Sequence, residues 1–266
     1  MDASDPDEAV TLLRRASVLS ACREESLTRR QLTERVDASR TTIYRVTVAL
    51  AERGLLGKTD DGYRTTPQGA ALVAASDAFQ TAIETVDRLE PLLDIVDHPA
   101  LVEHAHLFSD ARVTVADASN PYRVVDRVIE RLEQTSNSRG TLTNVTSLQA
   151  LDQTTPHLEA IESLERIFAA SALEGHETTA SEGFRDVVSD ETITVLVADD
   201  NAVPFSFAID DVGVTVAGHD PATGLPTVHV ETESTAARSW LETLYEQCWE
   251  RARPIEFDAD SEHATE

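Results

Sequence analysis

The residues from Ser39 to Arg45 place small polar, basic and aromatic side chains within two turns of a predicted helix. When such a helix enters the major groove of DNA, an arginine can donate two hydrogen bonds to guanine, and a threonine can bond to a base or touch a thymine methyl group. These residue types therefore favour base contacts. The predicted set is Ser39, Arg40, Thr41, Thr42 and Arg45, with Tyr44 at the sugar-phosphate edge.

Four further basic side chains flank this segment and suit the phosphate backbone. Arg29 and Arg30 lie near the start of the preceding predicted helix, and Lys58 and Arg64 lie on a predicted hairpin. Phosphate contacts from such places orient a protein on a duplex. The alternative is a solvated face of an ordinary small helical domain. We favour DNA contact because the cap, the turn, the spacing and the hairpin all indicate the same structure.

Three short helices and a hairpin are predicted within residues 1–70. The apolar residues of the first helix recur at helical spacing, and Thr28 and Ser39 can cap the next two helices. Gly54 ends the third helix, and Gly62 supplies the positive φ of a hairpin turn. These elements present the polar segment at the start of the third helix.

This arrangement resembles the winged helix-turn-helix of archaeal and bacterial regulators of the arsenic-repressor and multiple-antibiotic-resistance types, over residues 8–70. The runs that carry the resemblance are Leu27–Leu32, Ser39–Arg45 and Leu50–Leu56. It implies a sequence-specific DNA-binding transcription regulator whose partner is double-stranded DNA. The alternative is a winged helix that binds other proteins, in an interaction or architectural protein with no sequence-specific DNA target.

A long connecting helix is predicted from Thr66-Pro67 to about Glu90, and Pro91 should kink or end it. Its apolar residues alternate in steps of three and four, as in the seam of a coiled coil. This seam consists of Leu72, Ala75, Phe79, Ala82, Val86 and Leu89. We expect the helix to join two copies in a homodimer, because two half-sites need two recognition helices. The alternative is that the seam packs on the carboxy-terminal domain of the same chain.

Helical and strand patterns alternate beyond residue 100. Strands are predicted at 112–116, 141–145, 193–197, 205–209, 212–216 and 228–230. Helices are predicted at 122–133, at 156–168, and from Ser234 onward with Pro254 as the stop. The predicted fold class is therefore α+β. It combines an N-terminal winged helix-turn-helix, a long connecting helix and a C-terminal α/β domain with a mixed or antiparallel sheet.

Residues 96–255 resemble the middle domain of the methanogenesis regulator of the Fil type. The matching runs are Ala118–Tyr122, Pro204–Asp211, Gly218–Asp220 and Ala236–Tyr245. The resemblance implies an effector or dimerisation domain and does not identify a ligand. Side chains next to these runs are weaker candidates for contacts to an unknown small-molecule effector, although the aromatic ones also suit a core. They are Asp117, Asn120, Tyr122, Phe205, Phe207, His219 and Trp240.

No motif with a catalytic mechanism is visible. The chain has no Gly-rich phosphate loop, no His-Glu-x-x-His and no Gly-x-Ser-x-Gly. His104 and His106 are two residues apart and would project to different sides of a helix, which favours a solvated loop over a metal site. We therefore expect no enzyme activity, no catalytic residue, no metal and no cofactor.

The negative charge is unevenly distributed along the 266 residues, whose formal net charge is −26. Residues 1–70 contain eleven basic and eleven acidic residues, whereas the remainder contains eleven basic and 37 acidic ones. This break predicts domains at 1–70, 71–95 for the connecting helix, 96–255, and a disordered acidic tail at 256–266. Because Lys58 is the only lysine, the composition also resembles that of proteins from salt-loving archaea.

The sequence predicts a cytoplasmic protein without a membrane partner. Its first eight residues are acidic where a signal peptide would be basic, and no apolar run is long enough to cross a bilayer. Cys22 and Cys248 are far apart, so neither a disulfide framework nor a thiolate zinc site is indicated.

Overall fold

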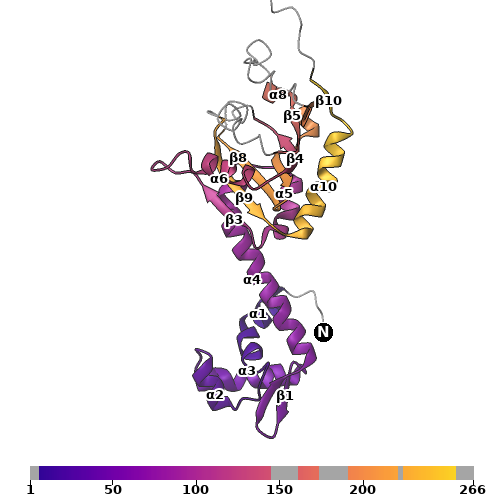
Figure 1. Ribbon diagram of the computed structural model, residues 1–266. Coiled ribbons are helices and arrows are strands. Elements are labelled where there is room, and N and C mark those ends of the chain that lie inside the picture. The colour runs from indigo at the N-terminus through magenta and orange to yellow at the C-terminus, as the bar shows by residue number, and fades with distance from the viewer. Residues whose placement is uncertain (1–5, 145–160, 174–190, 221–223, 256–266) are drawn as a thin grey trace, which may run out of the picture. The chain divides into compact units, whose positions relative to one another are not determined.

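A computed structural model describes residues 6–144, 161–173, 191–220 and 224–255 (Figure 1). Its contacts divide the chain into two compact units, Met1–Ile83 and Glu84–Glu266. The division falls inside the connecting helix α4 (Pro67–Leu93), which begins in the first unit and ends in the second. The predicted tail at 256–266 lies outside the described residues. Among the described helices, none has the length and apolar character needed to cross a membrane.

The N-terminal unit has the predicted three helices and hairpin. They are α1 (Pro6–Ala21), α2 (Arg29–Arg35), α3 (Arg40–Glu52), β1 (Leu56–Thr59) and β2 (Gly62–Thr65). Thr28 caps α2 in a capping box, and Ser39 Oγ accepts a hydrogen bond from Thr42 N at 3.2 Å. Gly54 has φ +70° after α3, as expected of a glycine that ends a helix. The local signals of this unit were therefore sufficient to predict it.

One cluster of buried aliphatic side chains joins all these elements. It includes Leu19 of α1, Leu32 of α2 and Ile43 of α3, each fully buried, and Val73 of α4. A pair of backbone hydrogen bonds, both 2.9 Å, also links Leu27 to Tyr63. The hairpin is thus attached to the segment that precedes α2, which fixes its position beside the two helices.

The C-terminal unit is built on an eight-stranded mixed sheet in the order β10-β6-β5-β4-β7-β8-β9-β3. Strands β4, β5 and β6 are parallel to one another and the other pairs are antiparallel. This confirms the predicted α+β class and the mixed sheet. The strands are β3 (Arg112–Val115), β4 (Asn137–Leu142), β5 (Ser163–Ala169), β6 (Ile193–Ala198), β7 (Ser206–Asp210), β8 (Val214–His219), β9 (Pro226–Thr232) and β10 (Arg253–Pro254).

Helices cover the two faces of this sheet differently. The main core contains Leu241 of α10 (Thr235–Trp249), Leu92 of α4, and inward residues of the strands such as Ile209. The next residue of β7, Asp210, points to the opposite face, where α6 (Arg123–Leu132) brings Arg131 to it. The remaining short helical segments are α5 (Pro99–His104), η1 (Ala105–Phe108), α8 (Ala170–Leu173) and η3 (Asp200–Ala202).

The helix predicted at 156–168 is wrong over its described part, because residues 163–169 form β5. This strand pairs with β4 on one side and β6 on the other. Leu164, Ile167 and Phe168 are all buried, although they do not alternate in steps of two. A central parallel strand is covered on both faces, so its apolar residues can mimic helical spacing. Residues 156–160 of that prediction lie outside the described residues.

Three other strands differ from their predicted ranges by two or more residues at both ends. Strand β4 begins at Asn137 and ends at Leu142, whereas a strand was predicted at 141–145. Strand β8 begins two residues later than expected, and β9 extends the short predicted strand on both sides. The segment around His104 was predicted as a solvated loop, but it is helical and the His104 ring stacks on Trp240 at 4.5 Å between centroids.

Candidate nucleic-acid interface and effector pocket

The first turns of α3 separate a buried face from an exposed polar face. Ile43, Thr47 and Leu50 point into the core at helical spacing. The predicted base-contacting residues lie on the other side and are exposed: Ser39, Arg40, Thr41, Thr42, Tyr44 and Arg45. A helix with this division can lie in a groove without disturbing its own packing.

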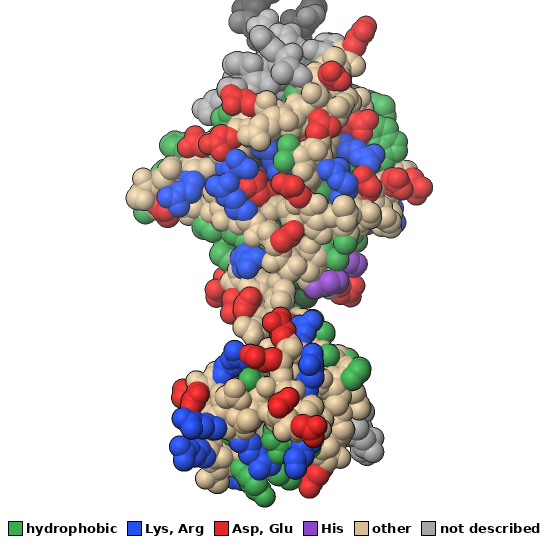
Figure 2. All heavy atoms as spheres, turned by 60° about the horizontal axis from the view of Figure 1, so that its bottom comes forward, with side chains coloured by type: hydrophobic (Ala, Val, Ile, Leu, Met, Phe, Trp, Pro, Cys, Tyr) green, Lys and Arg blue, Asp and Glu red, His purple; other side chains and the backbone are tan. Residues whose placement is uncertain are grey.

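The cations of this unit fall into two groups. Among the described residues, Arg40, Arg45 and Lys58 form no ion pair, and the first turn of α3 has no acidic residue. Other cations are engaged within the unit. Arg30 pairs with Glu34 at 3.2 Å, Arg35 pairs with Glu25 at 2.7 Å, and Arg64 donates to the Glu24 carbonyl at 3.2 Å. Figure 2 shows Lys and Arg side chains over the visible face of this unit, with Asp and Glu side chains between them.

Arg29 connects the three parts of the predicted interface. Its guanidinium carbon lies 4.4 Å from the centroid of the Tyr44 ring on α3 and 5.1 Å from that of the Tyr63 ring on β2. Its Nε donates to Thr47 Oγ1 at 3.0 Å. Stacked cation–π contacts of this kind favour one arrangement of the rings. Arg29 therefore positions Tyr44 relative to the hairpin, a role that its place in the sequence did not reveal.

Of the predicted effector residues, Asp117 and Asn120 belong to a tight turn after β3. Asp117 Oδ1 accepts hydrogen bonds from Ser119 N at 2.8 Å and Asn120 N at 3.0 Å, and the Ser119 hydroxyl also donates to it. These bonds hold the pKa of Asp117 below its usual value. Tyr122, which follows the turn, is 60% exposed. The described contacts of Asp117 thus stabilise the turn itself.

Three of the four predicted aromatic residues form part of the core. Phe205 and Phe207 are buried, with ring centroids 5.7 Å apart, and Trp240 lies 6.2 Å from Phe205. Phe205 lines a pocket of the C-terminal unit, which is described next, but Phe207 and Trp240 do not line it.

A pocket of about 310 Å³ brings two of the seven predicted effector residues together, Phe205 and His219. It lies between the segment that follows α4, the end of β4, the start of β7 and the end of β8. Its polar and aromatic lining consists of Asp97, His98, Thr143, Asn144, Phe205, Ser206 and His219. Burial lowers the pKa of His219 to about 4, so this ring is neutral near pH 7. The sequence did not predict Asp97, His98, Thr143 or Ser206, which come from segments far apart in the chain.

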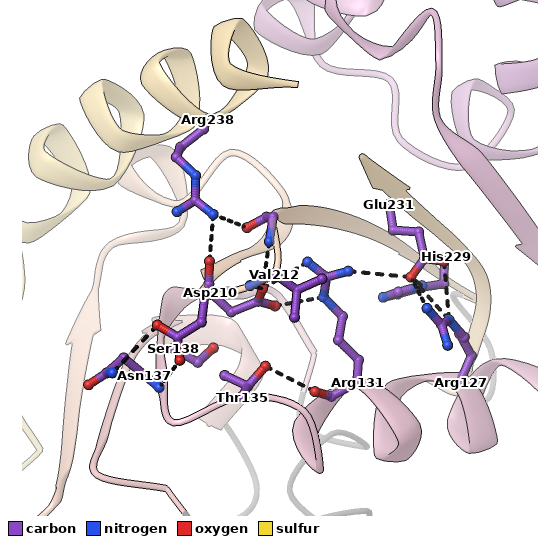
Figure 3. A network of polar contacts seen from close by, with 12 residues as sticks. Arg127, Arg131, Thr135, Asn137, Ser138, Asp210, Val212, His229, Glu231 and Arg238 are labelled. Atoms are coloured by element: carbon purple, nitrogen blue, oxygen red, sulfur yellow. Dashed lines mark hydrogen bonds and ion pairs between the residues drawn. The ribbon is translucent and has the colours of Figure 1, made fainter. Parts of the chain in front are cut away.

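A buried ionic network lies on the opposite face of the sheet, beneath α6 (Figure 3). Arg131 makes two hydrogen bonds to Asp210, of 2.6 and 2.8 Å, and a longer contact of 3.4 Å to Glu231. Arg127 also pairs with Glu231, at 2.9 Å. His229 lies beside them, and burial lowers its pKa to about 4. The network ties α6 to β7 and β9.

Comparisons with known proteins agree with the division into two units. Residues 4–88 match the family described as HVO_A0261 N-terminal domain, and residues 121–251 match the family described as methanogenesis regulatory protein FilR1, middle domain. The chain is similar to archaeal regulatory proteins. This supports the resemblance of the C-terminal domain to the Fil-type regulator. No curated protein matches the chain.

Solved structures give only distant similarities. The archaeal chromatin protein TrmBL2, described as showing a novel mode of DNA binding, has 15% identity and a TM-score of 0.41, with coverage of 94% of this chain and 100% of its own. NucT from Helicobacter pylori has 10% identity and a TM-score of 0.40, covering 55% of this chain and 98% of its own. Nuc from Salmonella typhimurium, a phospholipase D family member, has 14% identity and a TM-score of 0.39, covering 55% and 97%.

Proposed function

We propose that the chain is a sequence-specific DNA-binding transcription regulator that reads its site with the first turns of α3. The observation that carries the proposal is the exposure of Arg40 and Arg45 without an ion pair among the described residues, on a helix start capped by Ser39. Free guanidinium groups there can each donate two hydrogen bonds to a guanine. The similarity of residues 121–251 to a regulatory protein supports the same function.

The proposal includes a homodimer joined through α4. Phe79, Ile83 and Val86 lie on one side of this helix at spacings of four and three residues, and they are 54%, 47% and 54% exposed. Phe79 and Val86 belong to the predicted seam and Ile83 lies beside it, whereas Leu72 and Leu89 of that seam pack into the cores of the two units. The middle of the seam is therefore available to the α4 of a second copy, in the manner of a coiled coil.

The C-terminal unit acts in this proposal as the domain that receives an effector, and it performs no catalytic step. Its acidic surface suits a cytoplasm with concentrated salt, where charge repulsion is screened. DNA affinity in such a solvent depends less on counterion release and more on contacts to the bases.

The proposal is tested by selecting genomic fragments with the purified full chain in concentrated salt and measuring affinity for the enriched sequence. A lost bidentate base contact costs roughly 1–3 kcal/mol, so Arg40→Ala and Arg45→Ala should each weaken binding about tenfold or more. Arg14→Ala removes the same charge from an exposed position on α1 and serves as the matched control.

Two results would contradict the proposal. Equal binding of all fragments would favour the architectural alternative, in which the winged helix has no sequence-specific target. Unchanged affinity of both α3 variants, with specificity retained, would place base recognition elsewhere on the chain.

A further inference from the structure

The 310 Å³ pocket of the C-terminal unit lies directly at the end of the connecting helix. Helix α4 ends at Leu93, and the segment from Ile95 to His98 forms one wall of the pocket. The other walls come from the end of β4, the start of β7 and the end of β8. Any molecule in this space would touch the residues that immediately follow α4.

The end of α4 is also packed closely against the pocket's own strand. A Cβ atom at Gly218 would lie 3.4 Å from Leu92 Cδ1 and 3.5 Å from the Ile95 Cβ. Gly218 precedes His219, which lines the pocket. A ligand that displaces His219 or Ile95 therefore acts on side chains in contact with the last turn of the helix.

Several polar groups in the pocket are free to meet a ligand. Within the described part of the chain, the side chains of Asp97 and His219 have no hydrogen bond or ion pair, and Asp97 is exposed. His98 accepts a hydrogen bond from Ala100 N at its Nδ1, at 3.3 Å, which leaves its Nε2 to meet a ligand. Ser206 and Thr143, by contrast, are bonded to each other at 3.0 Å. The pocket thus offers one carboxylate acceptor and a neutral imidazole that can both donate and accept.

The charge of the lining and the volume of the pocket indicate which kind of ligand it can bind. Among the described residues, no lysine or arginine lines the pocket, so an anion would meet the Asp97 carboxylate without a compensating cation. Ile95, which is 38% exposed, supplies an apolar wall, and the buried Phe205 lies behind the lining. A volume of about 310 Å³ is at the lower limit for ligand sites, which restricts the occupant to roughly one ring.

A larger groove of about 590 Å³ between α10 and the starts of β4 and β5 is a weaker candidate, because its charged groups are already engaged. Arg238 donates to the carbonyls of Asp210 and Gly213, and Arg139 pairs with Glu242 at 3.5 Å. Asp211 accepts from two backbone amides, both at 2.8 Å. These contacts hold α10 and the β7–β8 turn on the sheet.

We propose that the pocket at the end of α4 binds a small organic cation with a single ring, whose ammonium or amidinium group pairs with Asp97 and whose ring lies against Ile95. Its occupancy changes the affinity for DNA through α4. Only this last consequence rests on the proposed function. The binding itself is independent of DNA.

Three probes of one shape and different charge test the assignment: benzylamine, benzyl alcohol and benzoate. Binding to the full chain is measured without DNA by ligand-observed NMR and by the rise in Tm, in the same salt for each probe. Benzylamine should bind most tightly and benzoate should not bind. Because charge-assisted hydrogen bonds are the strong ones, Asp97→Asn should weaken benzylamine binding about tenfold. The control Asp94→Asn removes the same charge from an exposed residue that does not line the pocket.

The outcomes separate the parts of the proposal. Absence of benzylamine binding, equal binding of benzyl alcohol, or equal weakening by Asp94→Asn would overturn the assignment of the pocket. His219→Leu, which keeps a side chain of similar bulk but removes both ring nitrogens, should also weaken the binding of benzylamine.

The coupling to DNA is tested next. Benzylamine should change the affinity of the wild-type chain for its selected DNA more than it changes the affinity of the Asp97→Asn variant. A ligand that binds without this change would refute the coupling through α4 and leave the DNA-binding proposal intact.

Discussion

Replacement of Arg131 by methionine tests whether the ionic network beneath α6 determines the stability of the C-terminal unit. The side chains of Arg131 and Asp210 are only 8% and 5% exposed, and two hydrogen bonds of 2.6 and 2.8 Å join them. Removal of one partner of such a buried pair leaves the other charge without compensation, which costs about 3–5 kcal/mol.

The remaining contacts reduce this cost. Asp210 Oδ1 also accepts hydrogen bonds from Val212 N and Gly213 N, both at 2.9 Å. Glu231, the other partner of Arg131, retains its ion pair with Arg127. We therefore expect Arg131→Met to lower the free energy of unfolding by about 3 kcal/mol, at the lower end of that range.

Urea unfolding followed by tryptophan fluorescence measures this unit by itself, because Trp240 and Trp249 are the only tryptophans and both lie in α10. The double variant Arg131→Met/Asp210→Asn should recover a large part of the loss, since asparagine removes the orphaned charge and keeps an oxygen for the turn amides. Arg123→Met is the surface control. Its partner Asp117 is 3.2 Å away and both side chains are about half exposed, so the cost should stay below about 1 kcal/mol.

The reasoning fails if Arg131→Met costs no more than Arg123→Met. It also fails if the double variant is destabilised by the sum of the two single effects, because the charges would then not be coupled.

Three further perturbations have defined outcomes. The pKa of His229 is about 4 in the folded chain and ordinarily 6.5, so the unfolded chain takes up the proton first as the pH falls. Stability should therefore decrease between about pH 6.5 and 4, by up to about 3 kcal/mol from this group, and His229→Gln should flatten the pH dependence measured by urea unfolding. Phe79→Glu should convert the proposed dimer to a monomer of 29.0 kDa in light-scattering measurements, whereas Ala78→Glu, at an exposed neighbouring position, should not. Finally, the Tm should rise with KCl concentration because salt screens the excess of acidic residues, and a Tm independent of KCl would argue against adaptation to concentrated salt.

The N-terminal unit was predictable because its determinants are local. The Thr28 and Ser39 caps, Gly54 at the end of α3 and Gly62 in the hairpin each act within a few residues. Such signals can be recognised in a single sequence. The stacking of Arg29 on Tyr44 and Tyr63 was not predictable, since it depends on how the helices and the hairpin pack.

The C-terminal unit was harder to predict because its structure depends on distant pairings. Strand β5 was mistaken for a helix because both of its faces are covered, which removes the alternation of apolar residues. Of the pocket residues, Phe205 and His219 were predicted from the resemblance. Asp97 and Thr143 were not, because only the folded sheet brings the end of β4 beside the segment after α4.

The two edges of the sheet would limit aggregation of the chain if it works in concentrated salt, as proposed. One edge is the two-residue strand β10, in which Pro254 lacks an amide hydrogen, and the other is β3, four residues long and ended by the Asp117 turn. Short edges, proline and tight turns oppose strand addition from another molecule. In molar salt the Debye length is about 3 Å, so mutual repulsion of acidic surfaces no longer keeps molecules apart. Protection from aggregation would then come from the geometry of these edges, with the α4 seam left for specific pairing.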